Sequence, residues 1–404
     1  MRILHVIPSV SPVRGGPSEA VLAMVRALRA EGVDAEIATT NDNGDQVLAV
    51  PLDKLTTHAD APVRFFARFS PPLRPVREFA YSRGLSRWLA EAVTGYDLLH
   101  VHAVFSYAST RAMKLARERR IPYLNRPLGQ LCVWSLRQRA LKKRVYLALA
   151  ERANLRGAAA LHFTTTQEQT EAEVLRLGTH GFVAPHGIEL AARVPDARVR
   201  LRERLGVPPE SKVVLFLSRL HPKKGLEVLI PALARVTDPQ LIFALAGTAE
   251  SPAFDAEVER WLAEAGLAAR TRRAGFASGE WKQTLLQGAD VFALTSHSEN
   301  FGIAVVEAMA AGLPVVVTPG VALAEEVARF DTGLVPAQNS ASVAAAVAEL
   351  LAEAPRREAL GRNGQRLVHE RYTWPAAARR IAGEYRMILD RSGRPAATPG
   401  IVHV

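Results

Sequence analysis

Two glutamates, Glu299 and Glu307, have the chemistry and the spacing to hold hydroxyl-rich ligands such as sugars or ribose. Glu299 lies in a predicted loop after strand 290–294, and Glu307 lies about one turn inside the helix that follows. Carboxylates accept hydrogen bonds from neighbouring hydroxyl groups. Gly302 permits a tight turn, and the first N–H groups of a helix form an anion site. The backbone beside this site belongs to Asn300, Phe301, Gly302 and Ile303.

A second group suits phosphate chemistry. Arg219 and Lys224 directly follow the predicted strand 213–218. An arginine fork and a lysine point charge can hold a diphosphate from two sides. This positive charge would stabilise a leaving nucleoside diphosphate without the help of a metal ion.

A third motif is the pair Gly15 and Gly16, which lies between the predicted strand 3–7 and the predicted helix 17–30. Two glycines before a helix N-terminus let the backbone approach a phosphate or a sugar. The motif is not the G-x-G-x-x-G fingerprint of dinucleotide-binding proteins.

Each motif also has a purely structural interpretation, which the sequence leaves open. Glu299 could only complement the helix dipole, and Glu307 could be a surface charge. The basic loop with Lys224 could cap the next helix, and the two glycines could form a plain strand–helix turn.

The sequence predicts no metal site and no cofactor. It contains no Asp-x-Asp pair, no histidine pair at H-E-x-x-H spacing and only one cysteine, Cys132. Zinc sites normally need several such ligands at regular spacing. The single cysteine also excludes an intrachain disulfide bond.

The elements that must position these residues alternate between short apolar strands and amphipathic helices. Continuous Val, Leu and Ile strands alternating with helices are typical of parallel sheets covered on both faces. We therefore predict an α/β fold with two doubly wound, Rossmann-like domains that face each other across a cleft. The predicted strands are 3–7, 35–39, 98–102, 123–125, 159–164, 182–184, 213–218, 241–246, 290–294, 315–318 and 334–335, and the predicted helices include 17–30, 226–236, 303–311, 340–353 and 356–369.

A polar, proline-containing stretch at 187–209 separates the two series of elements. A length of 404 residues also suits two domains at about 100–200 residues each. The predicted organisation is an N-terminal Rossmann-like domain at 1–190, a C-terminal Rossmann-like domain at 191–372, a helix at 373–391, and a disordered tail at 392–404.

The chain is basic, with a net charge of +11. The excess is concentrated in the segments 62–90, where aromatic residues are interleaved, and 137–156. Such surfaces suit anionic lipid headgroups or phosphorylated acceptors, although a solvated basic face on ordinary helices fits equally. No nucleic-acid-binding motif accompanies the charge, so nucleic acid is not a predicted partner.

The apolar N-terminal run is short and interrupted by Pro8 and Pro12, which does not fit a signal peptide. No stretch reaches the roughly 18 apolar residues of a membrane-spanning helix. We expect a cytoplasmic protein, with peripheral attachment to the inner face of the cell membrane left open.

These motifs, in this order, resemble glycosyltransferase family 4, a large family of retaining GT-B enzymes. The resemblance covers nearly the whole chain. It includes the opening Gly15–Gly16 turn, the strand 97–102, the turn 184–188, the loop 218–225 and the segment 299–316, which is similar to the E-x7-E motif with its flanks.

The resemblance implies that the domain 1–190 binds the acceptor, that the domain 191–372 binds the sugar nucleotide, and that the helix 373–391 crosses back to the first domain. It also implies a role for each motif. Arg219 and Lys224 would bind the donor diphosphate, Glu307 the donor ribose, and Glu299 the hydroxyls of the transferred sugar. Gly302 and Ile303 would offer backbone N–H groups, Gly15 and Gly16 would close over the donor, and Phe276 would pack beside the base. Metal-dependent GT-A enzymes usually carry the Asp-x-Asp pair, so its absence favours metal-independent transfer.

Two positions depart from the family pattern. His186 replaces the usual Asn of a Pro-Asn-Gly turn, and Leu128 stands where many members have a histidine near the sugar. His102 is therefore a candidate polar group for catalysis, or else a satisfied histidine at a strand end.

The sequence thus predicts a retaining hexosyltransferase that uses a UDP- or GDP-linked donor. The predicted acceptor is a saccharide or lipid-linked saccharide in the biosynthesis of exopolysaccharide, capsule or O-antigen. A sugar-nucleotide epimerase of the same fold and a catalytically silent donor-binding subunit are the alternatives.

Overall fold

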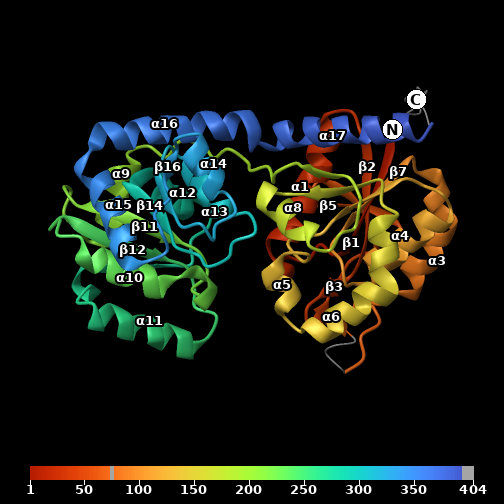
Figure 1. The fold of residues 1–404 in the computed structure, drawn as a ribbon, viewed down its shortest axis with the longest axis horizontal. Helices are drawn as coiled ribbons and strands as arrows, with labels where there is room; N and C mark the ends of the chain where they lie inside the picture. Colours follow the sequence, from red (N-terminus) through yellow and green to blue (C-terminus); the bar gives the residue numbers. More distant parts are fainter. Residues whose placement is uncertain (73–76, 394–404) are drawn as a thin grey trace. The chain divides into compact units, whose positions relative to one another are not determined.

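The computed structural model describes residues 1–72 and 77–393, which form two compact units (Figure 1). Unit 1 contains Met1–Gly187 and the segment that begins at Trp374, and unit 2 contains Ile188–Thr373. The sequence places the corresponding boundaries after residues 190 and 372. Most of the predicted tail, from residue 394 onward, lies outside the described residues.

Unit 1 is built on an eight-stranded sheet within the described part of the chain, in the order β10-β9-β8-β7-β1-β2-β6-β5. Neighbouring strands pair in parallel except β5 and β6, which are antiparallel. The strands are β1 (Arg2–Ser9), β2 (Asp34–Thr40), β5 (Leu55–His58), β6 (Ala61–Phe66), β7 (Leu98–His102), β8 (Tyr123–Arg126), β9 (Ala160–Phe163) and β10 (Gly181–Val183), with β3 (Asp42–Asn43) and β4 (Gln46–Val47) forming a separate small hairpin.

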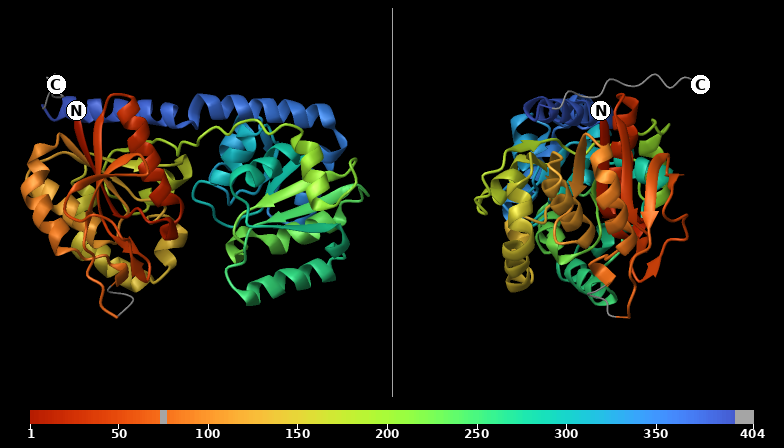
Figure 2. Two further views of the ribbon diagram at one scale, coloured as in Figure 1. Left: turned by 180° about the vertical axis from the view of Figure 1, so that it is seen from behind. Right: turned by 90° about the vertical axis from the view of Figure 1, so that its right-hand side faces the viewer.

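Helices cover both faces of this sheet (Figure 2). On one face, α1 and α17 share a buried apolar cluster with the strands; on the other, α3, α4, α7 and α8 do so. The helices of unit 1 are η1 (Pro12–Arg14), α1 (Gly16–Ala30), α3 (Arg83–Ala92), η2 (Val93–Gly95), α4 (Tyr107–Glu118), α5 (Val133–Arg137), α6 (Ala140–Tyr146), η3 (Leu147–Glu151), α7 (Arg152–Arg156), α8 (Thr166–Glu173) and α17 (Trp374–Arg391).

Unit 2 is built on a six-stranded parallel sheet within the described residues, in the order β13-β12-β11-β14-β15-β16. Its strands are β11 (Lys212–Leu217), β12 (Leu241–Ala246), β13 (Thr271–Gly275), β14 (Val291–Leu294), β15 (Val315–Val317) and β16 (Gly333–Leu334). Its helices are α9 (Ala197–Leu205), η4 (Pro222–Lys224), α10 (Leu226–Arg235), α11 (Pro252–Glu264), η5 (Ala268–Arg270), α12 (Gly279–Gly288), α13 (Ile303–Ala310), α14 (Ala324–Arg329), α15 (Ser340–Ala352) and α16 (Ala354–Arg371).

Each sheet contains one point where the direction of strand addition reverses. In unit 2 this switch point lies between β11 and β14, and in unit 1 it lies between β1 and β7. Ligands of doubly wound sheets bind outside the carboxyl ends of the strands at such points. The residues that follow β1, β7, β11 and β14 are therefore the candidates for ligand binding.

Part of the basic, aromatic-rich segment 62–90 is buried, which corrects its interpretation as a surface. Its first residues complete β6, where Phe65 and Phe66 are buried because they join the apolar clusters on the two faces of the sheet. Arg68 is also buried, as an ion-pair partner of Asp42. Arg74 lies outside the described residues.

Candidate active site

At the switch point of unit 2, the loop after β11 lies directly against the loop after β14. Gly225 has a positive φ of 71°, and a Cβ at this position would lie 2.0 Å from the carbonyl oxygen of Thr295. Only glycine allows this approach. The Thr295 hydroxyl donates to the Gly225 carbonyl at 2.8 Å, and the His297 N–H donates to the Lys223 carbonyl at 2.9 Å.

This contact brings two predicted site residues together. The Nζ of Lys224 forms an ion pair with the carboxylate of Glu299, and their side chains are 14% and 21% exposed. The backbone of Glu299 is fixed on both sides, since its N–H donates to the Gly320 carbonyl at 2.8 Å and its carbonyl accepts from the Ala322 N–H at 3.0 Å. A cation and a carboxylate therefore stand side by side at the position where ligands of this fold bind.

The turn into α13 has the predicted glycine geometry. Gly302 has a φ of 85° and is the residue before the helix, which begins at Ile303. Phe301 is buried, with its ring 6.0 Å from the ring of Tyr372, so its side chain belongs to the core of unit 2. Ile303 is exposed, and Asn300 is half-buried.

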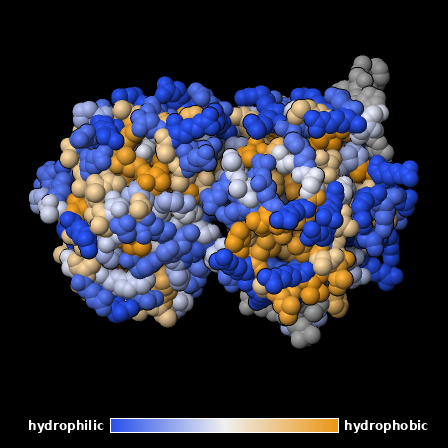
Figure 3. Space-filling view, in the orientation of Figure 1, coloured by the Kyte–Doolittle hydropathy of each residue, from blue (hydrophilic) through white to orange (hydrophobic). Residues whose placement is uncertain are grey.

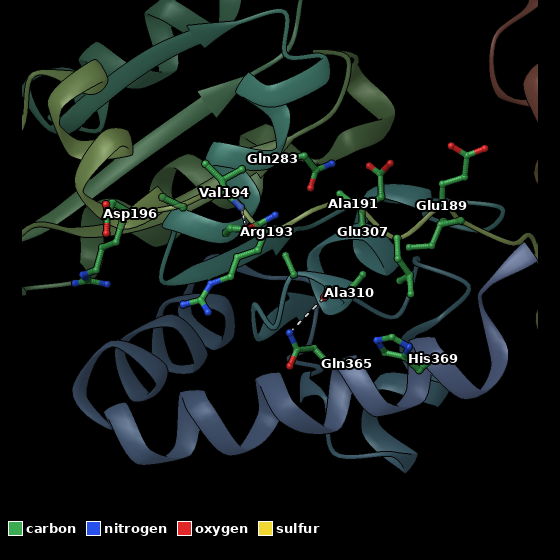
Figure 4. A pocket seen from close by; sticks show the side chains of 16 residues that line it. Glu189, Ala191, Arg193, Val194, Asp196, Gln283, Glu307, Ala310, Gln365 and His369 are labelled. Atoms are coloured by element: carbon green, nitrogen blue, oxygen red, sulfur yellow. Dashed lines mark hydrogen bonds between the residues drawn. The ribbon is translucent and has the colours of Figure 1, made fainter.

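Glu307 has a partner that the sequence did not indicate. Its Oε1 lies 2.7 Å from the Nζ of Lys282, which comes from α12. Glu307 also borders a polar cavity of about 680 Å³, with Gln283 on the same side and Gln365 and His369 of α16 opposite (Figure 4). Among the described residues, it is the only predicted donor-binding residue that lines this cavity.

The remaining predicted residues of unit 2 lie near the same ends of the strands. Arg219 is exposed and follows β11. Phe276 follows β13 and has 73% of its surface exposed, so its ring is available to a planar ligand.

In unit 1, the predicted glycine turn follows β1 at the switch point. Gly15 has a φ of 74° and caps α1, and Gly16 is the first residue of this helix. The preceding Arg14 makes a bidentate ion pair with the buried Asp42, at 2.7 and 2.8 Å. Burial alone would raise the pKa of Asp42, but hydrogen bonds and charge from Arg14, together with the charge of Arg68, hold that pKa below its usual value. The turn is thus anchored by a buried charge cluster.

His102 ends β7, the other strand at this switch point, and is fully buried. Its Nε2 lies 3.0 Å from the Nδ1 of His5. Burial, followed by the nearby charges of His5 and Arg126, lowers the pKa of His102 well below its usual value. The ring is therefore neutral at pH 7.

Sequence reasoning missed the surroundings of His102. His5, His100 and His102 offer ligand atoms that all lie within 4.8 Å of one another, which is a spacing that a metal ion could use. The signal was present in the alternation of His100 and His102 along one buried strand, since alternate residues share a face.

Two doubly wound units, with a lysine–carboxylate pair and a helix N-terminus at the switch point of the second, define the GT-B class of glycosyltransferases. Residues 198–367 match the family model "Glycosyl transferases group 1", and residues 15–179 match "Glycosyl transferase 4-like domain". The chain belongs to the group 1 glycosyltransferases, also called family 4.

Curated relatives span nearly the whole chain. D-inositol 3-phosphate glycosyltransferase of Xylanimonas cellulosilytica is 28% identical, with 95% of this chain and 93% of the relative covered. The enzyme of the same name from Jonesia denitrificans is 29% identical, with 95% of each chain covered.

Solved structures share the fold. HepE of Anabaena in complex with UDP has a TM-score of 0.74 at 23% identity, covering 96% of this chain and 100% of the other. Sucrose-phosphate synthase of Thermosynechococcus elongatus has a TM-score of 0.73 at 23% identity, covering 97% and 100%.

Proposed function

We propose that the protein is a retaining, metal-independent glycosyltransferase that moves a hexose from a UDP- or GDP-linked donor to an acceptor hydroxyl. The observation that carries this proposal is the Lys224–Glu299 pair at the switch point of unit 2, beside the start of α13. Structures of HepE are complexes with UDP, with UDP and glucose, and with UDP-glucose, which supports a nucleoside diphosphate sugar as the donor here.

In the proposed reaction, Arg219, Lys224 and the N–H groups of Gly302 and Ile303 bind the donor diphosphate. Glu307 accepts hydrogen bonds from the ribose hydroxyls. The bond between the sugar and the diphosphate breaks first, and the positive groups stabilise the charge that develops on the leaving oxygen. The acceptor hydroxyl then attacks from the face that the diphosphate has left, so the anomeric configuration is retained.

Glu299 holds hydroxyls of the transferred sugar in this scheme. Its ion pair with Lys224 keeps both side chains ordered before the donor arrives. When the diphosphate takes over Lys224, the carboxylate becomes free to accept hydrogen bonds from the sugar. Acceptors bind to unit 1 in this scheme, and the proposed role of Gly15 and Gly16 is to offer their backbone to the donor.

Donor binding by Glu307→Ala provides the first test. Because this variant loses charge-assisted hydrogen bonds to the ribose, we expect binding to be about 10- to 100-fold weaker. Isothermal titration with a panel of UDP- and GDP-sugars in EDTA measures the binding, and release of the nucleoside diphosphate measures turnover. Glu257→Ala, which removes an exposed carboxylate of α11, is the matched control and should bind like the wild type.

The same experiment separates the alternatives. An epimerase would convert the donor without releasing a nucleoside diphosphate to an acceptor. A catalytically silent subunit would bind one donor tightly and never turn it over. Wild-type protein that binds no donor in the panel, or that requires a divalent metal for turnover, would contradict the proposal.

The acceptor is proposed to be a saccharide on a lipid carrier, in the synthesis of exopolysaccharide, capsule or O-antigen. Support comes from a surface of unit 1 that we call the α5–η3 surface, where hydrophobic side chains gather (Figure 3). Its exposed apolar side chains are Trp134, Leu141, Val145, Leu149 and Val174. Arg137, Lys143 and Arg144 line an apolar groove of about 240 Å³ between them.

Such a combination of apolar and basic side chains suits the headgroup region of an anionic membrane. No helix among the described residues is long and apolar enough to cross a membrane. We therefore propose peripheral attachment to the inner face of the cell membrane, through the α5–η3 surface.

Vesicle binding by the double variant Leu141→Glu, Leu149→Glu tests this attachment. These side chains are 78% and 84% exposed, so the change should leave folding intact and weaken binding to vesicles containing phosphatidylglycerol by at least about 10-fold, because two apolar contacts are lost and two negative charges are added. Sedimentation measures the bound fraction. Val199→Glu, at an exposed apolar position of α9 in unit 2, should bind like the wild type. Equal binding of the wild type to neutral and anionic vesicles would remove the electrostatic part of the argument.

A further inference from the structure

A row of polar side chains lies buried on the otherwise apolar face of the unit 1 sheet that α1 and α17 cover. His5 comes from β1, His100 from β7, His162 from β9 and Tyr385 from α17, and all four are fully buried. Buried polar groups are costly unless they are hydrogen-bonded. Their partners therefore determine where each proton must lie.

The backbone carbonyl of Ala184 fixes the position of the first proton, and the other protons can be assigned from it in turn. The Nε2 of His162 lies 2.8 Å from the carbonyl oxygen of Ala184, which can only accept, so Nε2 carries the proton. Burial, followed by the charge of Arg126, lowers the pKa of His162, and the neutral ring has no proton on Nδ1. This Nδ1 lies 3.2 Å from the Nε2 of His100 and accepts its proton.

The order continues through Tyr385. The neutral ring of His100 has a bare Nδ1, which accepts from the Tyr385 hydroxyl at 2.7 Å. The hydroxyl lies 3.4 Å from the Nε2 of His5, and because its proton already points to the nearer partner, its oxygen accepts from that nitrogen. The bare Nδ1 of His5 then accepts from the Nε2 of His102 at 3.0 Å.

The last ring in this series of hydrogen bonds is His102. Because its Nε2 carries the proton, its Nδ1 has none. This nitrogen is buried and has no hydrogen-bond partner among the described residues. An unsatisfied buried acceptor is energetically unfavourable, so its presence calls for a ligand group that donates a hydrogen bond to it. His102 stands at the carboxyl end of β7, at the switch point of unit 1.

We propose that Tyr385, His5, His100 and His162 are positioning residues, which fix His102 in the tautomer whose bare Nδ1 accepts a hydrogen bond from a substrate hydroxyl group. This inference rests on the proposed transferase function for the identity of the substrate. It assigns to α17 a part in the active site, since Tyr385 is the link between His100 and His5.

A metal ion is the competing use of the same histidines. The ring nitrogens of His5 and His100 are already engaged as donors and acceptors within the chain. Arg126 is fully buried nearby, and its charge opposes a proton on His5, so it would oppose a metal cation in the same way. These facts favour a hydrogen-bonded series of neutral histidines over a bound metal ion.

Histidine ¹⁵N chemical shifts test the proposal, because protonated and bare ring nitrogens differ widely. The full chain carries selectively ¹⁵N-labelled histidine, and His102→Gln identifies the His102 signals. We expect a bare Nδ1 on His102 in the wild type. In Tyr385→Phe, His5 loses the acceptor for its Nε2 proton and becomes free to change tautomer, so a second His102 form with a protonated Nδ1 should appear.

Tyr372→Phe is the matched control, since the Tyr372 hydroxyl pairs with Glu326 in unit 2 and the change should leave the His102 signals as they are. A protonated Nδ1 on wild-type His102 would overturn the proposal, and so would identical His102 signals in the wild type and Tyr385→Phe. Stoichiometric zinc in the purified wild type would overturn it in favour of a metal site.

Steady-state kinetics of Tyr385→Phe provide a second test of the proposal. Tyr385→Phe should lower kcat by about 10- to 100-fold while the donor KM stays within about twofold, because the substrate hydroxyl loses the hydrogen bond that orients it and the donor site in unit 2 is untouched. An unchanged kcat would contradict the positioning role. Failure of the proposed transferase function would appear differently, as wild-type protein without any turnover whose His102 tautomer nevertheless follows the expected pattern.

Discussion

Lys224→Met is expected to lower kcat for sugar transfer by about 100- to 1,000-fold, which is typical for loss of one group that stabilises developing charge. Lys224 is the positive side chain that pairs with Glu299 at the switch point of unit 2. In the variant, the partly buried Glu299 loses its ion-pair partner Lys224, so the carboxylate repels the anionic donor as well. Both kcat and donor affinity should therefore fall, as measured by steady-state transfer in EDTA and by titration with the donor.

The double variant Lys224→Met, Glu299→Gln separates these two effects. Removing the negative charge should restore much of the donor affinity, whereas kcat should stay low because the leaving diphosphate still lacks its lysine. Lys212→Met is the matched control, since Lys212 pairs with Asp238 at the opposite end of β11 and should leave kcat within about twofold. A Lys224→Met enzyme with wild-type kcat would remove Lys224 from the reaction.

The sequence predicts the fold of each unit well because buried parallel strands appear as short apolar runs between helices. Strand 241–246 is predicted as it is found in β12, and strand 98–102 is found unchanged as β7. Both strands lie inside a sheet with helices on both faces, so all their residues are buried. In β12 the result is a continuous apolar run, whereas β7 also contains the buried histidines His100 and His102. The family and the GT-B fold were predicted for the same reason, together with the E-x7-E spacing.

Prediction failed where a segment's character depends on distant partners. The composition of 62–66, like that of its basic neighbours, predicts a surface segment. The structure instead places these residues in β6, because pairing with β2 and β5 satisfies the hydrogen bonds of their backbone. An arginine in a basic segment is expected at the surface, yet Arg68 is buried because it pairs with Asp42, which lies in the β3–β4 hairpin. Local sequence holds no sign of either partner.

The candidate site shows the same division. Gly302 and Gly15 were recognisable because a turn that needs positive φ leaves a glycine in the sequence. Lys282 and Tyr385 were not, since each becomes a neighbour of Glu307 or His100 only through packing of a separate helix. Sequence therefore finds groups that act through their own loop, and structure is needed for groups that act through another element.

Stability should depend strongly on pH well above the range in which carboxylates titrate. His5, His100, His102, His162 and His186 are all buried, and burial first of all, with the charge of Arg126 also contributing, lowers the pKa of each. For His5 the value falls from 6.5 to about 3. Below pH 6.5 the unfolded chain binds protons that the folded chain does not, so the free energy of unfolding falls with falling pH.

The expected loss between pH 6.5 and pH 5.5 is about 5 kcal/mol, at roughly 1 kcal/mol for each of the five histidines. Asp42 adds nothing in this window, because its pKa lies below 3.8 and its contribution disappears only at lower pH. Urea unfolding followed by circular dichroism at closely spaced pH values measures the dependence.

His186→Asn isolates one of the five groups. Asparagine does not titrate, and its side-chain oxygen can accept from the Nη2 of Arg126, which now lies 3.0 Å from the Nδ1 of His186. The fall in unfolding free energy between pH 6.5 and pH 5.5 should therefore be about 1 kcal/mol smaller than in the wild type. A wild-type protein whose stability is flat across this window would mean that the histidines take up protons in the folded state. The neutral rings on which the order of protons around Tyr385 depends would then be lost as well, so this measurement also bears on the positioning of His102.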